Sequence, residues 1–298
     1  MPERTTRPVA DRQYNLIGYT RPKSQFLKWV GSKYRYAPQI ADAMPHELER
    51  YVEPFVGSGA VLATVAPQHG LAGDTLLPLM EIWNLLKADP DALLTHYRQL
   101  WTEYCTKPKE VYERVRDEYN GKPNGPDFLF LCRACYGGVV RFTKTGAMST
   151  PVGPHRAISP DSLCERMREW RSRVMNTEFV HADFEETMAQ VGQGDVVYCD
   201  PPYACSQRIL YGSQDFLLER LWHAIEGCKQ RGARVLLSLD GTKKSGTVRA
   251  DVVAPDGLFE REILIDCGRS MLRRFQKRGQ NMSGETVHDR LLLTWAED

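Results

Sequence analysis

The segment Glu53-Pro54-Phe55-Val56-Gly57-Ser58-Gly59 ends a short apolar run that begins at Val52. It is followed at once by a second apolar stretch, Ala60-Val61-Leu62-Ala63-Thr64-Val65-Ala66. Two apolar runs joined by closely spaced glycines predict a strand, a tight turn and the start of a helix. This order of elements is typical of the opening of an α/β fold.

Strand signals return in three later segments, 178–181, 196–199 and 235–239, and helical stretches separate them. A last pair of apolar segments, 262–265 and 291–295, lies close enough in the sequence to form a hairpin. The chain is therefore expected to form an α/β sheet that ends in a C-terminal β-hairpin.

A mainly helical insertion is expected to interrupt this sheet. Residues 79–120 carry apolar side chains at helical spacing, and residues 160–176 read as an Arg-rich helix. Residues 121–160 are rich in glycine and proline, which predicts loops. The helical spacing predicts core positions at Leu93, Tyr97, Leu100, Trp101 and Tyr104.

These boundaries divide the chain into three parts. Residues 1–20 are expected to form a polar N-terminal arm. The sheet domain is expected to comprise residues 21–84 and 177–298, and the insertion residues 85–176, which is the size of a small domain.

Composition places the chain among soluble globular proteins. Its 298 residues are 42% hydrophobic, and no run approaches the roughly 20 apolar residues of a membrane span. The N-terminus lacks the apolar stretch of a secretory signal, so a cytoplasmic location without membrane contact is expected. The eight cysteines show no framework spacing, and the lone Cys132-x-x-Cys135 pair does not predict a metal site.

The net charge of +1 conceals an uneven distribution of charge. Six Lys or Arg and no acid lie within residues 12–41, eight against three lie within 133–173, and five against none lie within 268–280. If these segments share one face, they form a surface for a polyanion such as DNA. The alternative is three separate solvated faces.

The glycine turn at residues 57–59 is a candidate site for a cofactor that contains a nucleoside, because glycines there let a ligand approach the backbone at a helix N-terminus. The F-x-G-x-G spacing differs from the dinucleotide and P-loop patterns, which argues against NAD and ATP. A tight structural turn is the alternative. Asp74, after the next apolar segment, is placed to accept from ribose hydroxyls, or else to cap a helix ahead of Leu76-Leu77.

A second candidate site is Asp200-Pro201-Pro202-Tyr203, at the end of the apolar segment 196–199. The Asp200 carboxylate and the Pro201 carbonyl are two acceptors for the hydrogens of a planar aryl amine such as adenine N6, and they would direct its lone pair at a methyl donor. Tyr203 would supply a ring face for the base, which must leave the DNA stack to reach it. A rigid turn that ends a strand is the alternative.

Together these residues resemble the DNA adenine methyltransferase (Dam) family, the D12 class of N6-adenine-specific enzymes, over residues 26–295. The resemblance implies a Rossmann-like methyltransferase sheet that binds S-adenosyl-L-methionine. The segment Phe26-Leu27-Lys28-Trp29-Val30-Gly31-Ser32-Lys33 looks like the family motif K-W-x-G-[GS]-K. This match implies that Trp29 and Lys33 contact the cofactor and that Lys28 lies near the DNA.

Three more matches imply cofactor contacts. The segment 53–59 is similar to the motif E-P-F-x-G-S-G, which assigns Phe55, Gly57 and Gly59 to the cofactor. Asp74 matches the acid of D-x-N-x-x-L-I-x-x-W, although Leu76 replaces its Asn. The segment Ala182-Asp183-Phe184 stands where the family lines the cofactor's adenine ring, which implies that role for Asp183 and Phe184.

The insertion resembles the family's target-recognition region. The segment from Cys135 to Phe142 is similar to C-Y-N-G-L-x-R-Y, which implies that Tyr136 inserts into the base stack and that Arg141 reads a guanine edge. Val139 stands at a further DNA-contacting position of the motif, where the family has Leu. Gly137 replaces the family's Asn, so the GATC target does not transfer directly.

The resemblance predicts a DNA adenine-N6 methyltransferase that acts on a flipped-out adenine in double-stranded DNA, at GATC or a related G-containing site. No obligate protein partner and no metal are expected. Two alternatives stay open: an N-methyltransferase of RNA or of a protein amide, and a catalytically silent DNA-binding regulator of the same fold.

Overall fold

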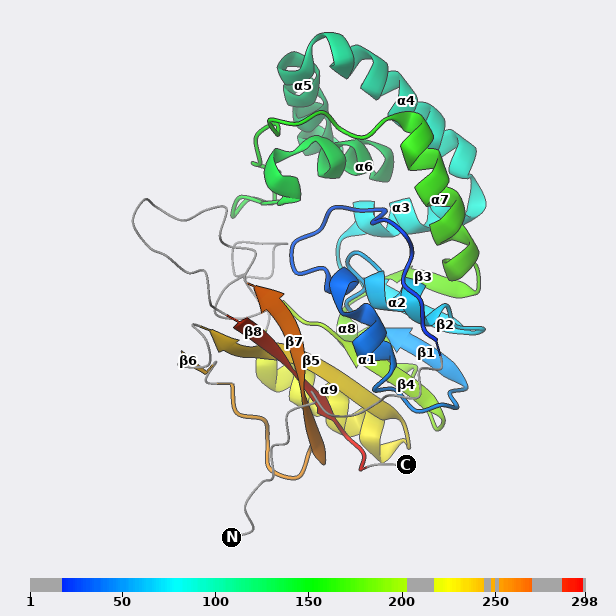
Figure 1. The fold of residues 1–298 in the computed structure, drawn as a ribbon, viewed down its shortest axis with the longest axis vertical. Helices are drawn as coiled ribbons and strands as arrows, with labels where there is room; N and C mark the ends of the chain where they lie inside the picture. Colours follow the sequence, from blue (N-terminus) through cyan, green and yellow to red (C-terminus); the bar gives the residue numbers. More distant parts are fainter. Residues whose placement is uncertain (1–17, 203–216, 244–247, 250–251, 270–285, 297–298) are drawn as a thin grey trace.

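The computed structural model describes residues 18–202, 217–243, 248–249, 252–269 and 286–296. Within them, an eight-stranded sheet has the order β3-β2-β1-β4-β5-β8-β7, and β6 pairs with β5 (Figure 1). The strands are β1 (Arg50–Glu53), β2 (Gly70–Asp74), β3 (Thr177–His181), β4 (Asp195–Cys199), β5 (Arg234–Lys243), β6 (Val248–Arg249), β7 (Arg261–Arg269) and β8 (Thr286–Leu293).

Strands β3, β2, β1, β4 and β5 are mutually parallel, whereas β8 runs antiparallel to both β5 and β7. This order, with an antiparallel pair at one edge, is the Rossmann-like methyltransferase sheet that was predicted. The pairing of β7 with β8 also confirms the pairing predicted for the C-terminal hairpin. Because the parallel strands share a direction, the turns after β1, β2 and β4 meet at one edge of the sheet.

Helices cover both faces of the sheet. They are α1 (Ala37–Ala41), α2 (Ala60–Val65), α3 (Leu77–Ala88), α4 (Pro90–Thr106), α5 (Pro108–Gly121), α6 (Gly125–Ala134), α7 (Pro160–Val174), α8 (Phe184–Ala189) and α9 (Leu218–Gln230), with short 3-10 turns η2 (Lys33–Arg35) and η3 (Tyr136–Gly138). Successive residues of β4 point to opposite faces of the sheet. Tyr198 belongs to the core under α2 and α3, and Val197 to the core under α8 and α9.

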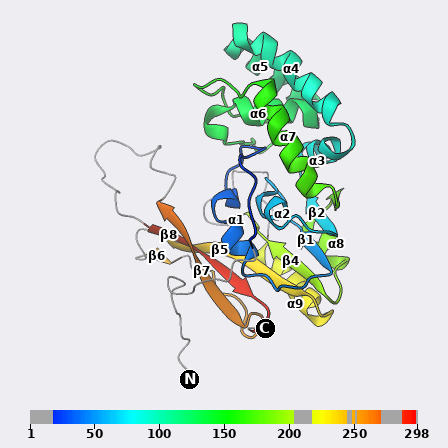
Figure 2. The ribbon, with the colours of Figure 1, turned by 45° about the vertical axis from the view of Figure 1, so that its right-hand side comes forward.

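The helical insertion lies between β2 and β3, and its helices α4, α5 and α6 gather at one end of the molecule (Figures 1 and 2). The helical spacing predicted from the sequence is confirmed, since Leu93, Tyr97, Leu100 and Tyr104 are buried and Trp101 is partly buried. Helix α7 confirms the predicted Arg-rich helix. The predicted boundary at residue 84 falls inside α3, and the division into domains stays a prediction.

The prediction of loops throughout residues 121–160 is wrong, because α6 occupies Gly125–Ala134. The Asn124 side chain accepts a hydrogen bond from the Asp127 backbone N–H and caps the helix, and Pro126 occupies its first turn. The run Phe128–Cys132 is fully buried all round the helix. Gly125 and Pro126 therefore form the start of a helix. Their residue types are also typical of loops, so composition alone did not indicate this role.

An aromatic cluster joins the insertion to the sheet. The Trp83 ring lies 5.9 Å from that of Trp170 on α7 and 5.6 Å from that of Phe26, and it stacks on Phe179 of β3 at 5.3 Å. The Trp170 indole N–H also donates to the Ser24 carbonyl at 2.7 Å. The N-terminal segment, the insertion and the sheet therefore share one buried contact.

Trp170→Ala is expected to lower the free energy of unfolding by about 3–5 kcal/mol, because it leaves a cavity inside this cluster and an unpaired carbonyl. Denaturant unfolding followed by circular dichroism measures the change. Trp222→Ala on α9 is the control, since Trp222 is only partly buried and its removal is expected to cost less. Equal losses in the two variants would contradict the role given to the cluster.

Candidate active site

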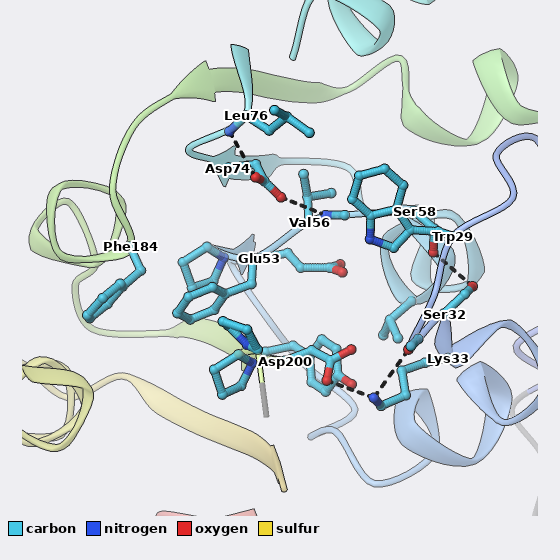
Figure 3. Close-up of a pocket in the computed structure, with 18 of the residues that line it drawn as sticks. Trp29, Ser32, Lys33, Glu53, Val56, Ser58, Asp74, Leu76, Phe184 and Asp200 are labelled. Carbon is cyan, nitrogen blue, oxygen red and sulfur yellow. Dashed lines mark hydrogen bonds and ion pairs between the residues drawn. The ribbon is translucent and has the colours of Figure 1, made fainter. Parts of the chain in front are cut away.

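A cavity of about 270 Å³ opens where β1, β2 and β4 end (Figure 3). It is lined by residues 29–33, the turn after β1 with the start of α2, the end of β2, the start of α8, the residues after β4 and one residue of α9. The lining includes Trp29, Lys33, Phe55, Gly57, Asp74, Asp183, Phe184, Asp200, Pro201 and Pro202 from the sequence prediction. Tyr203 lies outside the described residues.

Two indoles explain the glycines of the turn after β1. Gly57 and Gly59 have φ of +44° and +61°, a region that side chains rarely adopt. A Cβ on Gly57 would lie 3.0 Å from the Trp29 Nε1 atom, and one on Gly59 would lie 2.9 Å from the Trp83 ring. Gly57 lines the cavity, whereas Gly59 caps α2 and packs against Trp83 outside the lining. The turn is therefore both a structural constraint and one wall of the cavity.

Asp74 ends β2 and holds the turn in place. Its Oδ2 accepts from the Gly57 backbone N–H, and its Oδ1 accepts from the Leu76 N–H, both at 3.1 Å. The N-cap position of α3 belongs to Leu76, so Asp74 is not the helix cap that the sequence left open. Burial raises the pKa of Asp74, and these backbone hydrogen bonds counteract that rise.

Lys33 and Asp200 form an ion pair at the cavity, in which the lysine is buried and the aspartate is partly exposed. The Lys33 Nζ lies 2.7 Å from Asp200 Oδ1 and 3.8 Å from Asp289 Oδ2, and it donates to the Gly31 carbonyl at 3.4 Å. The Lys33 side chain is only 3% exposed, and Figure 3 shows its ammonium directed at Asp200. The sequence predicted a cofactor contact for Lys33, and the structure adds a direct contact with the predicted reactive acid.

Glu53 at the end of β1 is a lining residue to which the sequence gave no role. The Tyr51 hydroxyl donates to its carboxyl at 2.7 Å. Burial, with the nearby charge of Asp200, raises the pKa of Glu53 to about 8, although the Tyr51 hydrogen bond acts in the opposite direction. An acid at the end of an apolar run was the available signal for this residue.

The opposite wall is aromatic. The rings of Phe55 and Phe184 stack 5.2 Å apart at an interplanar angle of 25°. Asp183 caps α8 by accepting from the Glu185 backbone N–H at 3.0 Å. Arg220 of α9 pairs with Asp183 at 3.1 Å and also lines the cavity. No local pattern marked Arg220, because it is one charged residue on an amphipathic helix.

The predicted DNA-contacting residues lie apart from the cavity lining. Tyr136 is 47% exposed, and the Arg141 side chain is exposed as well. Thr150 fixes the backbone between them, since its hydroxyl accepts from the Arg141 N–H and donates to the Val139 carbonyl. A Cβ on Gly138 would lie 2.7 Å from the Lys28 Cβ, so Lys28 packs against this turn. One region of the structure therefore contains Lys28, η3 and the exposed side chain of Arg141, which the sequence predicts to contact DNA.

The basic segment 133–173 is only partly a surface. Arg133 is 3% exposed, and it and Arg166 donate to the Gln25 carbonyl. Arg171 and Arg173 donate to the carbonyls of Lys87 and Ala63. Half of the basic residues in this segment therefore hold backbone segments together, which the count of charges could not show.

Six cysteines lie within the described residues, and all six are free thiols. In the same part of the chain, no cluster of His, Cys, Asp and Glu could hold a metal ion, and no helix is long and apolar enough to span a membrane.

Comparison with known proteins gives a match to the family model for D12 class N6 adenine-specific DNA methyltransferases over residues 29–248. A DNA N-6-adenine-methyltransferase of Escherichia phage P1 is 28% identical over 96% of this chain, which spans 36% of the phage protein. A DNA adenine methylase of Vibrio cholerae is 30% identical over 72% of this chain and 80% of its own length. The type II methyltransferase M.MjaIII of Methanocaldococcus jannaschii is 32% identical over 72% of this chain and 83% of its own length.

Glu53→Gln is expected to flatten the dependence of stability on pH. The folded protein keeps the Glu53 proton up to about pH 8, whereas the unfolded chain releases it near the ordinary value of 4.5. The free energy of unfolding therefore falls as the pH rises between these values, by up to about 1.4 kcal/mol per pH unit. Glutamine keeps an acceptor for Tyr51 and has no proton to release.

Urea unfolding of both proteins between pH 5 and pH 8 measures this difference. Glu49→Gln is the matched control, because Glu49 is exposed and its removal is expected to leave the pH dependence of the wild type. A wild-type free energy of unfolding that stays level over this range would contradict the assignment.

Proposed function

The chain belongs to the D12 class of N6 adenine-specific DNA methyltransferases, and we propose that it transfers a methyl group from S-adenosyl-L-methionine to adenine N6 in double-stranded DNA. The observation that carries the proposal is the Lys33–Asp200 ion pair at the floor of the cavity. It presents an oriented carboxylate beside the Asp-Pro-Pro turn, at the edge of the sheet where such folds carry out their chemistry.

The residues that line the cavity suit S-adenosyl-L-methionine. Its ribose has two hydroxyls for the Asp74 carboxylate, and the aromatic wall of Phe55 and Phe184 suits its adenine ring. The carboxylates of Asp74 and Asp200 favour a ligand that carries positive charge on a sulfonium and an amino group. When bound, this cofactor supplies an electrophilic methyl group.

Asp200 is suited to hold the adenine amino group. The Asp200 carboxylate accepts one N6 hydrogen and the Pro201 carbonyl accepts the other, while the Lys33 contact at Oδ1 orients the carboxylate. The ammonium of Lys33 favours the ionised carboxylate, so Asp200 acts as an acceptor that orients the amine. Tyr203 would provide the ring face for the base.

The insertion is the proposed DNA-recognition domain. The exposed side chains of Tyr136 and Arg141, with Val139 and Lys28 close by, form a compact region for a DNA groove. By the motif match, Tyr136 inserts into the base stack beside the flipped-out adenine, and Arg141 reads a guanine edge. We expect a target such as GATC or a related site that contains guanine.

Two other functions are outcomes of the same assay. Wild-type protein and labelled S-adenosyl-L-methionine are incubated in parallel with duplex DNA, RNA and a protein extract. Labelled DNA, with N6-methyladenine found by sequencing that detects modified bases, supports the proposal. Label in RNA or protein alone identifies another N-methyltransferase, and no label together with DNA binding identifies a silent regulator.

Asp200→Ala is expected to reduce methyl transfer by at least about a hundredfold, because the amine loses an oriented acceptor in the transition state. Binding of S-adenosylhomocysteine and of duplex DNA is expected to persist, and it also verifies that the variant folds. Transfer rates come from single-turnover assays. A variant that keeps the wild-type rate would exclude Asp200 from the reaction.

Asp74→Ala is expected to weaken binding of S-adenosylhomocysteine by roughly tenfold or more, because the ribose loses its acceptor and the Gly57 turn loses a support. Calorimetry measures the affinity. The set of methylated DNA sites is expected to stay unchanged, and an altered site preference would contradict a role confined to the cofactor.

A further inference from the structure

Arg220 is the one residue of α9 among those that line the cavity. Its guanidinium contacts Asp183 at 3.1 Å and Glu185 at 2.6 Å, and both partners lie at the start of α8. The hydrogen bond to Arg220 lowers the pKa of Glu185. One cation of α9 thus joins the first turn of α8 to the edge of the cavity.

Arg220 contacts Oδ1 of Asp183, one of the two carboxylate oxygens. Both the Glu185 backbone N–H and Arg220 donate to Asp183 Oδ1. Within the described part of the chain, Oδ2 receives no hydrogen bond, and Asp183 borders the cavity. The two donors fix the plane of the carboxylate, so its second oxygen is available to a ligand.

The same guanidinium lies over the ring of Phe184, with Cζ 5.1 Å from the ring centroid. Phe184 is buried and stacks on Phe55. A cation above an aromatic face is attractive and restricts the tilt of the ring. Arg220 therefore acts on the two residues of this wall that are assigned to the adenine ring of the cofactor.

We propose that Arg220 is a positioning residue that makes this wall selective for an aminopurine nucleoside: it holds Asp183 so that Oδ2 accepts from the exocyclic amino group of the cofactor's adenine. The inference rests on the proposed function, because it concerns the same cofactor. It adds selectivity between an amino group and a carbonyl at that purine position.

The test compares two probes, S-adenosylhomocysteine and its deaminated analogue S-inosylhomocysteine, by calorimetry on the full chain. Arg220→Ala is expected to weaken binding of the adenosyl compound by roughly threefold to tenfold, in line with the loss of a solvent-exposed ion pair and an oriented acceptor. Binding of the inosyl compound is expected to change little, because its oxygen cannot donate to Asp183. Arg220→Lys is expected to retain part of the preference.

Two controls separate positioning from general stability. Arg114→Ala removes an arginine with two carboxylate partners on the surface of α4 and α5, and it is expected to leave both affinities unchanged. In an Asp183→Ala background, Arg220→Ala is expected to add little further loss of adenosyl binding, because its effect passes through Asp183. An equal further loss in that background would overturn the positioning role.

The outcomes also separate this inference from the proposed function. If the wild type binds S-adenosylhomocysteine and methylates DNA, but Arg220→Ala keeps the same preference for the adenosyl probe, the inference fails and the function stands. If the wild type binds neither probe, the proposed cofactor is wrong and the inference falls with it.

Discussion

The ion pair between Lys33 and Asp200 constrains the rest of the site. Lys33 is almost completely buried, and a buried ammonium is tolerated only when carboxylates and carbonyls surround it. Its partners come from distant parts of the sequence, since Asp200 follows β4 and Asp289 lies on β8. Removing one partner of such a pair generally costs about 3–5 kcal/mol. The cavity is therefore complete only when the N-terminal segment, the parallel strands and the C-terminal pair have assembled.

Trp29 provides a second link, between the cavity and the insertion. Its indole covers Gly57 on one side and meets the ring of Phe128 on α6 edge-on, with centroids 6.2 Å apart. The preceding residue, Lys28, packs against Gly138 of η3. A single short segment thus contacts both the candidate cofactor turn and the region proposed to bind DNA. This arrangement gives a physical reason why residues 28–33, which lie before the first strand of the sheet, matter to both parts of the site.

Local patterns predicted what depends on neighbours in the sequence. The apolar runs predicted the strands, and the glycine turn and the Asp-Pro-Pro turn led to the cavity because their residue types restrict the backbone. The sequence missed Arg220, Asp289 and the Tyr51–Glu53 contact as parts of the site. Each of these is one polar residue within an ordinary helix or strand, and its role appears only when distant elements pack together. Helix α6 was missed for a different reason, since its capping residues have the composition of a loop.

Two acids that line the cavity, Glu53 and Asp200, have different surroundings. Glu53 is buried beside a tyrosine hydroxyl and holds its proton up to about pH 8, whereas Asp200 faces the ammonium of Lys33. Negative charge on both carboxyls would be unfavourable, and the ammonium of Lys33 favours ionisation of Asp200, which it contacts, over that of Glu53. Environment therefore separates the roles of two similar groups, as it does in enzymes that use paired carboxylates. A neutral Glu53 leaves Asp200 as the charged acceptor next to the Asp-Pro-Pro turn, which is the state that the orientation of an aryl amine requires.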